Sequence, residues 1–290
     1  MHRHRGRSNA EAGTWKFMIR TLKLHSPFNV EAYRTAKERE EALLLGYLVA
    51  GDPAIEESYE MIQASVLAGM DIIELGVPSP DPFIDGEVIK RAHKRALEAG
   101  AAASEGLLDL WRRVRRDVSR PIWAMGYRNE LVEEGLYRRL IEEKLIDALV
   151  LPDCSLEEQI RIQEEVGPTG VDVIRFINSG MDEATIREVC DGATIIYAQS
   201  YSGTTGDPMA SVQGLAALCG RIRPHLPHGL VVAGFGLRSP ELVGQAIRGG
   251  FDGAVVGSVL VSRSENREKD YLYRLVAEMK LETLGSSTRG

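Results

Sequence analysis

The stretch Asp71-Ile-Ile-Glu-Leu-Gly-Val-Pro-Ser-Pro-Asp-Pro-Phe-Ile-Asp-Gly86 joins an apolar run, a proline-rich loop and the start of a helical segment. The run Ile72–Leu75 is apolar enough to predict a strand buried on both faces, although it contains Glu74. Burying a carboxylate in such a strand costs free energy, so it should be paired with another group or take part in function. Asp85 follows the loop, so these two carboxylates could divide acid and base work in one pocket.

The same order of apolar run, loop and helical segment recurs along the chain. Seven further runs predict strands: Leu43–Val49, Ile122–Met125, Ala148–Leu151, Val171–Phe176, Thr194–Tyr197, Leu230–Ala233 and Gly253–Val256. Helix starts between them are marked by a capping box at Ser155–Glu158 and by the pair Ser239-Pro240. Eight such units predict an α/β fold, a single (β/α)8 TIM barrel, with an extra N-terminal helix over residues 29–42. A doubly wound open sheet is the alternative, because strand order cannot be read from one sequence.

The bulk composition narrows the class of protein. The 290 residues are 44% hydrophobic and 27% charged, which is typical of a soluble globular chain. The net charge is −7, yet the first 25 residues carry six Lys or Arg and one Glu, a net +5, which leaves −12 for the remainder. An acidic body argues against nucleic acid as the main ligand, because phosphate backbones need basic surfaces.

Cysteine use and hydropathy bear on location. Cys154, Cys190 and Cys219 are odd in number and far apart, and they have no metal-ligand spacing, so we expect reduced thiols in a cytoplasmic protein without a metal site. No apolar run reaches the length of a membrane span. The Arg-rich start lacks a signal-peptide core. We expect residues 1–28 to be a basic, disordered extension, with a targeting tail as the alternative, and residues 29–285 to form the barrel domain.

Chemistry in such a barrel lies at the C-terminal ends of the strands. Glycine-rich segments follow the last three predicted strands, at Gly203–Gly206, at Gly234-Phe235-Gly236 and at Gly257-Ser258. Backbone N–H groups there could hold a phosphate, because glycine allows the close approach of oxygen atoms. Each motif taken singly is also compatible with an ordinary turn.

The remaining candidates each have a structural alternative. Asp81 and Asp85 could be turn or helix-cap residues, and Glu87 a favourable charge in a first helical turn. Glu74 could be a paired structural carboxylate, although its place near a strand end favours a function. Tyr127 and Tyr197 could line a pocket or only pack. We expect none of the six histidines to be catalytic, since His93, the nearest to the carboxylates, falls on the following helix.

These residues together resemble the α subunit of tryptophan synthase, the indole-3-glycerol-phosphate lyase family. The likeness runs from about residue 40 to 265. The following segments carry it: Gly51–Pro53, Glu74–Pro78, Asp81-Pro82, Asp85-Gly86, Ala96–Gly100, Tyr127 and Asn129, Asp153, Tyr197 with Gly203–Gly206, Gly234–Gly236 and Val256–Ser258.

The resemblance implies a retro-aldol cleavage of indole 3-glycerol phosphate to indole and glyceraldehyde 3-phosphate. Glu74 would protonate indole C3 and could also take the glycerol hydroxyl proton, while an ionised Asp85 would accept the indole N–H. Tyr197 would position Glu74. Thr205 would help a mobile loop to close over the pocket. The full set of substrate-binding residues implied is Tyr47, Tyr127, Asn129, Tyr197, Thr205, Gly206, Gly234, Phe235, Gly236, Gly257 and Ser258.

The resemblance also implies partners. No cofactor is expected in this chain, because pyridoxal phosphate would belong to a β subunit that completes an α2β2 heterotetramer. Several residues depart from the family pattern, namely Ser79-Pro80, Glu87, Tyr201 and Asp207-Pro208. All lie in the second and sixth loops, which meet the β subunit in the family. One alternative is a free-standing lyase of another pathway, which these departures favour more than is usual for the family. The other is a non-catalytic subunit that binds a phosphorylated ligand, although the presence of Glu74 and Asp85 argues against it.

Overall fold

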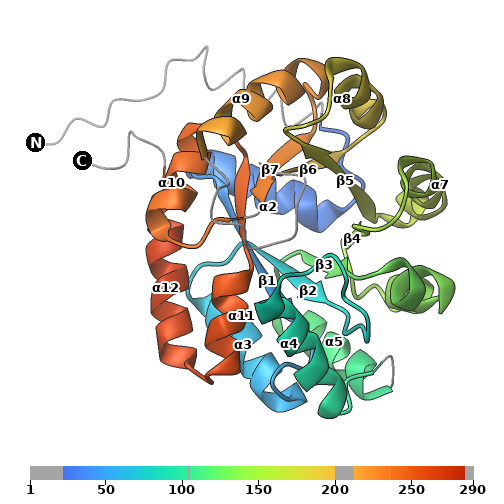
Figure 1. The fold of residues 1–290 in the computed structure, drawn as a ribbon, viewed down its shortest axis with the longest axis vertical. Helices are drawn as coiled ribbons and strands as arrows, with labels where there is room; N and C mark the ends of the chain where they lie inside the picture. Colours follow the sequence, from blue (N-terminus) through green and yellow to red (C-terminus); the bar gives the residue numbers. More distant parts are fainter. Residues whose placement is uncertain (1–21, 103–104, 200–211, 235, 285–290) are drawn as a thin grey trace, which may run out of the picture.

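The computed structural model describes residues 22–102, 105–199, 212–234 and 236–284. Its eight strands are all parallel, each pairs with its neighbour along the chain, and β1 pairs with β8 to close the ring (Figure 1). The strands are β1 Leu43–Val49, β2 Ile72–Gly76, β3 Ile122–Met125, β4 Ala148–Val150, β5 Asp172–Asn178, β6 Ile195–Gln199, β7 Leu230–Gly234 and β8 Gly253–Val256. The predicted runs match them to within two residues at each end. The predicted TIM barrel is confirmed, and the open sheet is excluded.

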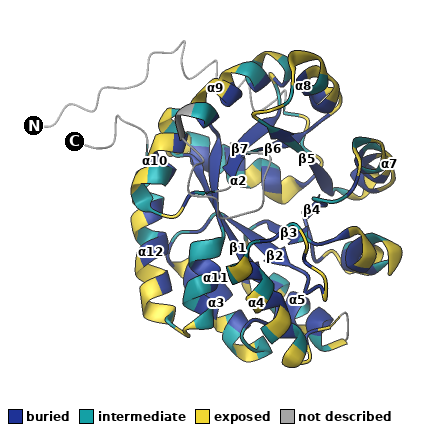
Figure 2. Cartoon of the chain, viewed as in Figure 1, coloured by how far each residue is buried: buried dark blue, intermediate teal, exposed yellow. Residues whose placement is uncertain are grey.

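Helices cover the outer face of the ring, so the strands are buried on both sides (Figure 2). The helices are α2 Pro27–Glu38, α3 Ile55–Leu67, α4 Glu87–Glu98, α5 Glu105–Asp117, α6 Leu136–Glu142, α7 Leu156–Val166, α8 Glu183–Cys190, α9 Val212–Ile222, α10 Pro240–Arg248, α11 Ser258–Glu265 and α12 Lys269–Glu282. A short π-helix, Asn129–Glu133, follows β3. The predicted capping box at Ser155 and the predicted cap at Ser239 are both present.

Alternate residues of each strand point into the barrel. Ile72 of β2 belongs to the apolar cluster that fills the interior. Glu74, two residues later, therefore shares that inward face, and it pairs in register with Tyr47 of β1. The sequence period of the strand thus places Glu74 at the upper layer of the interior, toward the C-terminal ends of the strands.

The extra N-terminal helix, α2, closes the opposite end of the barrel. Its Tyr33 and Ala36 pack against the interior cluster. Asn29 accepts a hydrogen bond from Trp123 Nε1 at 2.9 Å and donates to Asp172 Oδ2 at 2.9 Å. Residues 22–28, which the sequence assigned to the extension, also lie here, and the Ser26 hydroxyl donates to Asp147. Residues 1–21 of the predicted extension lie outside the described residues.

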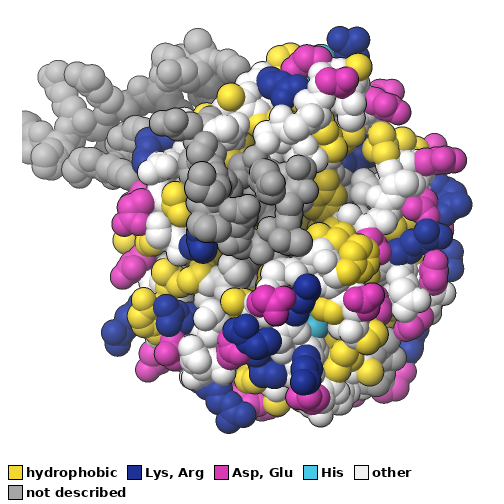
Figure 3. Space-filling view, in the orientation of Figure 1, with side chains coloured by type: hydrophobic (Ala, Val, Ile, Leu, Met, Phe, Trp, Pro, Cys, Tyr) yellow, Lys and Arg dark blue, Asp and Glu magenta, His cyan; other side chains and the backbone are white. Residues whose placement is uncertain are grey.

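The surface is mixed in charge. On the face shown in Figure 3, Lys and Arg side chains of the described residues are interspersed with Asp and Glu. The three cysteines are buried free thiols, as predicted. Within the described ranges, no helix combines the length and the apolar character needed to cross a membrane.

Candidate active site

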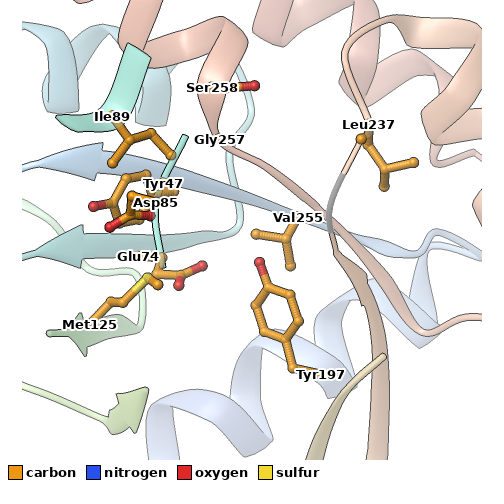
Figure 4. A pocket seen from close by; sticks show the side chains of 11 residues that line it. Tyr47, Glu74, Asp85, Ile89, Met125, Tyr197, Leu237, Val255, Gly257 and Ser258 are labelled. Atoms are coloured by element: carbon orange, nitrogen blue, oxygen red, sulfur yellow. The ribbon is translucent and has the colours of Figure 1, made fainter. Parts of the chain in front are cut away.

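A pocket lies at the C-terminal ends of the strands, where the barrel fold predicts chemistry. Seven predicted site residues line it together: Tyr47, Glu74, Asp85, Tyr197, Gly236, Gly257 and Ser258 (Figure 4). Four more lining residues were missed by the sequence analysis: Ile89, Met125, Leu237 and Val255. Strand alternation could have identified Val255, because it shares the inward face of β8.

Glu74 is buried in this pocket with 1% of its surface exposed. Neither of its carboxyl oxygens has a hydrogen-bond partner among the described residues. Burial, with a smaller effect of the nearby Asp85 charge, raises the pKa of Glu74 to about 8. At neutral pH the side chain, which lines the pocket, is therefore mostly a neutral acid.

Asp85 reaches the same pocket from the loop after β2. The Tyr127 hydroxyl donates to Asp85 Oδ2 at 2.7 Å. Burial, followed by the Asp85 charge, raises the pKa of Tyr127, so the phenol keeps its proton and can make this bond. The carboxylate does not cap α4, because the N-cap residue is Gly86 and it has no side-chain capping bond. The helix-cap alternative for Asp85 is thereby excluded.

Two tyrosines line the pocket because two glycines leave space for them. A Cβ atom at Gly76 would lie 2.4 Å from the Tyr47 hydroxyl oxygen. A Cβ atom at Gly234 would lie 1.7 Å from Cε1 of Tyr197. Gly234 lies against the Tyr197 ring, and its predicted contact with substrate stays a prediction. Figure 4 shows the Glu74 carboxyl and the Tyr197 ring pointing into the same space.

The last two strand ends supply backbone groups beside the carboxylates. Gly236 has a φ of +80°, a conformation that favours glycine. Gly257 and Ser258 form the N-terminus of α11, where free N–H groups attract anions. These groups line the same pocket as Glu74, so a phosphorylated ligand could contact both. Thr205, Gly206 and Phe235, which were also predicted to bind substrate, lie outside the described residues.

Two other predicted neighbours do not line the pocket. Tyr127 instead donates a hydrogen bond to Asp85, which does line it. The Asn129 side-chain amide donates to Glu130 on the π-helix at 3.4 Å and to Glu134, the residue that follows this helix, at 3.3 Å. Its predicted contact with substrate therefore stays a prediction.

That no histidine is catalytic stays a prediction, but His93 of α4 lies directly behind the pocket. His93 Nε2 is 3.6 Å from Asp85 Oδ2 and 3.4 Å from the Tyr47 hydroxyl. Helical spacing with buried Ile89 and Ala96 signals that His93 faces inward, but not what it meets.

An ion-pair network fixes the helices that carry the site. Arg95 of α4 holds Asp52 through two hydrogen bonds of 2.8 and 3.1 Å, and it also binds Glu265 of α11 at 2.9 Å. Asp52 therefore ties the loop after β1 to α4. Because α4 follows Asp85 and α11 starts at Ser258, this network fixes the position of Asp85 relative to Ser258.

Comparison with known proteins agrees with this architecture. The family model "Tryptophan synthase alpha chain" matches residues 33–285. The tryptophan synthase alpha chain of Granulibacter bethesdensis is 35% identical over 234 residues, which cover 79% of this chain and 83% of that protein.

Two solved structures share the fold. A chain from the Mycobacterium tuberculosis tryptophan synthase structure is 26% identical, with a TM-score of 0.77 over 89% of this chain and 98% of that one. A chain from the structure of the tryptophan synthase α2β2 complex of Pyrococcus furiosus is 26% identical, with a TM-score of 0.74 over 83% of this chain and 98% of that one. With the family model covering nearly the whole described barrel, the chain belongs to the tryptophan synthase alpha chain family.

Proposed function

We propose that this protein cleaves indole 3-glycerol phosphate to indole and glyceraldehyde 3-phosphate, as the α subunit of tryptophan synthase. The observation that carries the proposal is the pair of carboxyl groups in one pocket. Glu74 is held neutral by burial, and Asp85 receives a hydrogen bond from a tyrosine. Two neighbouring groups with such different environments suit one acid and one electrostatic partner.

Glu74 donates its proton to C3 of the indole ring, which converts the ring into a leaving group. The bond between C3 and the glycerol carbon then breaks, and its electron pair restores the aromatic ring. The hydroxyl group on that glycerol carbon becomes the aldehyde and returns its proton to the Glu74 carboxylate. Glu74 therefore ends the cycle in the form in which it began, and no cofactor in this chain is required.

Asp85 accepts the indole N–H and stabilises the positive charge that develops on the protonated ring. The Tyr127 and His93 contacts both reach Oδ2, so Oδ1 is the oxygen we assign to the substrate. Tyr197 and Tyr47 flank the reacting carbon. Gly236, Gly257 and Ser258 bind the phosphate group at the N-terminus of α11.

The partner in this proposal is a tryptophan synthase β subunit, in an α2β2 assembly in the cytoplasm. The β subunit would hold pyridoxal phosphate and consume the indole. The similar chain from Pyrococcus furiosus belongs to a tryptophan synthase α2β2 complex, which supports this assignment. The departures at Ser79-Pro80 and Glu87 are the reason to test the partner directly.

The test is a steady-state assay of indole release, with and without a β subunit of the family. We expect cleavage that accelerates when the β subunit is added. Fast cleavage that the β subunit leaves unchanged would replace the subunit with a free-standing lyase. The absence of cleavage under both conditions, together with binding of glycerol 3-phosphate, would favour the non-catalytic subunit.

A further inference from the structure

His93 lies outside the pocket lining and contacts groups that do line it. It is 2% exposed and comes from α4, the helix that follows Asp85. Its ring meets two pocket side chains on one edge, Asp85 and Tyr47. On the other edge, Nδ1 accepts a hydrogen bond of 2.9 Å from the Ser79 backbone N–H.

The Ser79 contact decides where the imidazole proton lies. A backbone N–H is always a donor, so Nδ1 must be the unprotonated acceptor. The ring proton therefore lies on Nε2 and points toward Asp85 Oδ2 and the Tyr47 oxygen. With this tautomer the donor edge of His93 faces the Tyr47 oxygen at 3.4 Å and Asp85 Oδ2 at 3.6 Å.

The segment that fixes this tautomer is itself held by the neighbouring loop. The Ser79 hydroxyl donates to Glu130 Oε1 at 3.1 Å and accepts from the Asp81 N–H at 3.2 Å. Glu130 lies on the π-helix after β3 and is 7% exposed. Ser79 is one of the residues that depart from the family pattern, and its environment here is a buried polar cluster shared with His93.

We propose that His93 is a positioning residue for Asp85: its Nε2–H and the Tyr127 hydroxyl together hold Oδ2, which turns Oδ1 toward the indole N–H. This inference rests on the proposed function. The 3.6 Å separation is longer than a hydrogen bond, and it shortens to one when a substrate N–H binds Oδ1, as contacts in ligand-free sites do.

Two substitutions of His93 separate its two edges. The side-chain amide of Asn reaches the position of Nδ1, so His93→Asn keeps an acceptor for Ser79 and loses the donor to Asp85. The longer Gln reaches the position of Nε2, so His93→Gln keeps the donor. We expect kcat of His93→Asn to fall on the order of tenfold to a hundredfold, the value of one hydrogen bond to a charged group. His93→Gln should recover most of that loss.

Binding of non-reacting ligands gives a readout that a merely structural role would not change. We expect His93→Asn to weaken binding of indole-3-propanol phosphate, measured by calorimetry, about tenfold. Binding of glycerol 3-phosphate, which lacks the indole, should match the wild type. Equal losses for both ligands, or equal losses of kcat in both variants, would overturn the positioning role. Failure of the wild-type protein to cleave indole 3-glycerol phosphate would instead overturn the proposed function.

The wild-type protein supplies a second measurement that does not depend on variants folding. Nitrogen-15 NMR of labelled histidine should show the Nε2–H tautomer at His93. The Nε2–H proton should shift downfield when indole-3-propanol phosphate binds and stay unchanged with glycerol 3-phosphate. An Nδ1–H tautomer, or a shift that is the same with both ligands, would contradict the proposal.

Discussion

At the N-terminal end of the barrel, Asp172 is fully buried and accepts hydrogen bonds from His25 N, Ser26 N and Asn29 Nδ2, at 2.9, 3.1 and 2.9 Å. At the C-terminal end, Glu74 is almost as deeply buried and accepts none from the described residues. One carboxyl group is satisfied and ties α2 to the strands. The other carries the cost of burial, which is usual for a group kept for chemistry.

The two ends also differ in how their space is filled. At the N-terminal end, α2 places Tyr33 and Ala36 against the interior cluster, so side chains close the barrel. At the C-terminal end, Gly76 and Gly234 leave space for the Tyr47 and Tyr197 side chains, which line an open pocket. The two buried carboxyl groups thus serve different ends of the barrel, so substitution of Asp172 should mainly change stability and substitution of Glu74 should mainly change catalysis.

The largest effect is expected from Glu74→Gln, which keeps the shape of the side chain and removes its acid proton. We expect kcat to fall on the order of 10² to 10⁴-fold, because a positioned general acid contributes that much. Binding of indole-3-propanol phosphate should persist. A steady-state assay measures the rate, and turnover close to the wild-type value would show that another group is the acid.

The matched substitution at the other end is Asp172→Asn. The new NH₂ group would replace a carboxylate oxygen that now accepts hydrogen bonds. Buried N–H donors would then lack an acceptor, which should lower the free energy of unfolding by about 3 kcal/mol. Urea denaturation measures this change. The kcat of the folded fraction should stay within about twofold of the wild type, since Asp172 lies at the opposite end from the pocket. A large loss of kcat without a loss of stability would break the separation of the two ends.

The sequence predicts those features of the two ends that depend on local patterns. The strands and the inward direction of Glu74 follow from short apolar runs and a period of two, which are local features. The predicted glycine loops and both carboxylates meet in one pocket because the barrel brings all strand ends together.

Contacts between distant segments could not be predicted in this way. Asp172 binds Ser26 and Asn29 across more than 140 positions of sequence. The helical spacing of α4 predicts that His93 is buried, but the rotation of α4 that brings it to Asp85 depends on the Arg95 network with Asp52 and Glu265. The role of Gly234 beside Tyr197 depends on the register of β6 with β7.

A smaller effect is expected from filling the space at the upper end. In Gly234→Ala the new methyl group would overlap the Tyr197 ring, and such overpacking should cost about 1–3 kcal/mol of unfolding free energy. We also expect a lower kcat, because Tyr197 must move. Gly220→Ala is the control, since a Cβ at this helical position meets no atom within 4 Å and Ala is the better helix former. Wild-type kcat and stability in Gly234→Ala would show that the pocket tolerates a displaced Tyr197.

The pH dependence of kcat tests whether Glu74 is protonated in the folded protein. One pH unit corresponds to about 1.4 kcal/mol of difference between the two protonation states. Its pKa is about 8 in the folded protein, raised from 4.5, so the acid form is present below pH 8 and is lost above it. We expect kcat to fall about tenfold for each pH unit above 8.

The raised pKa of Glu74 also makes the stability of the fold fall as the pH rises. Between pH 4.5 and 8, Glu74 ionises in the unfolded chain but stays neutral in the folded one. The unfolding free energy of the wild type should therefore fall, relative to Glu74→Gln, by about 1.4 kcal/mol per pH unit in that window, and level off above it. Urea denaturation of both proteins at several pH values measures the difference. A difference that does not change with pH would mean that Glu74 is ionised in the folded state, and it could not then be the proton donor that its unsatisfied burial indicates.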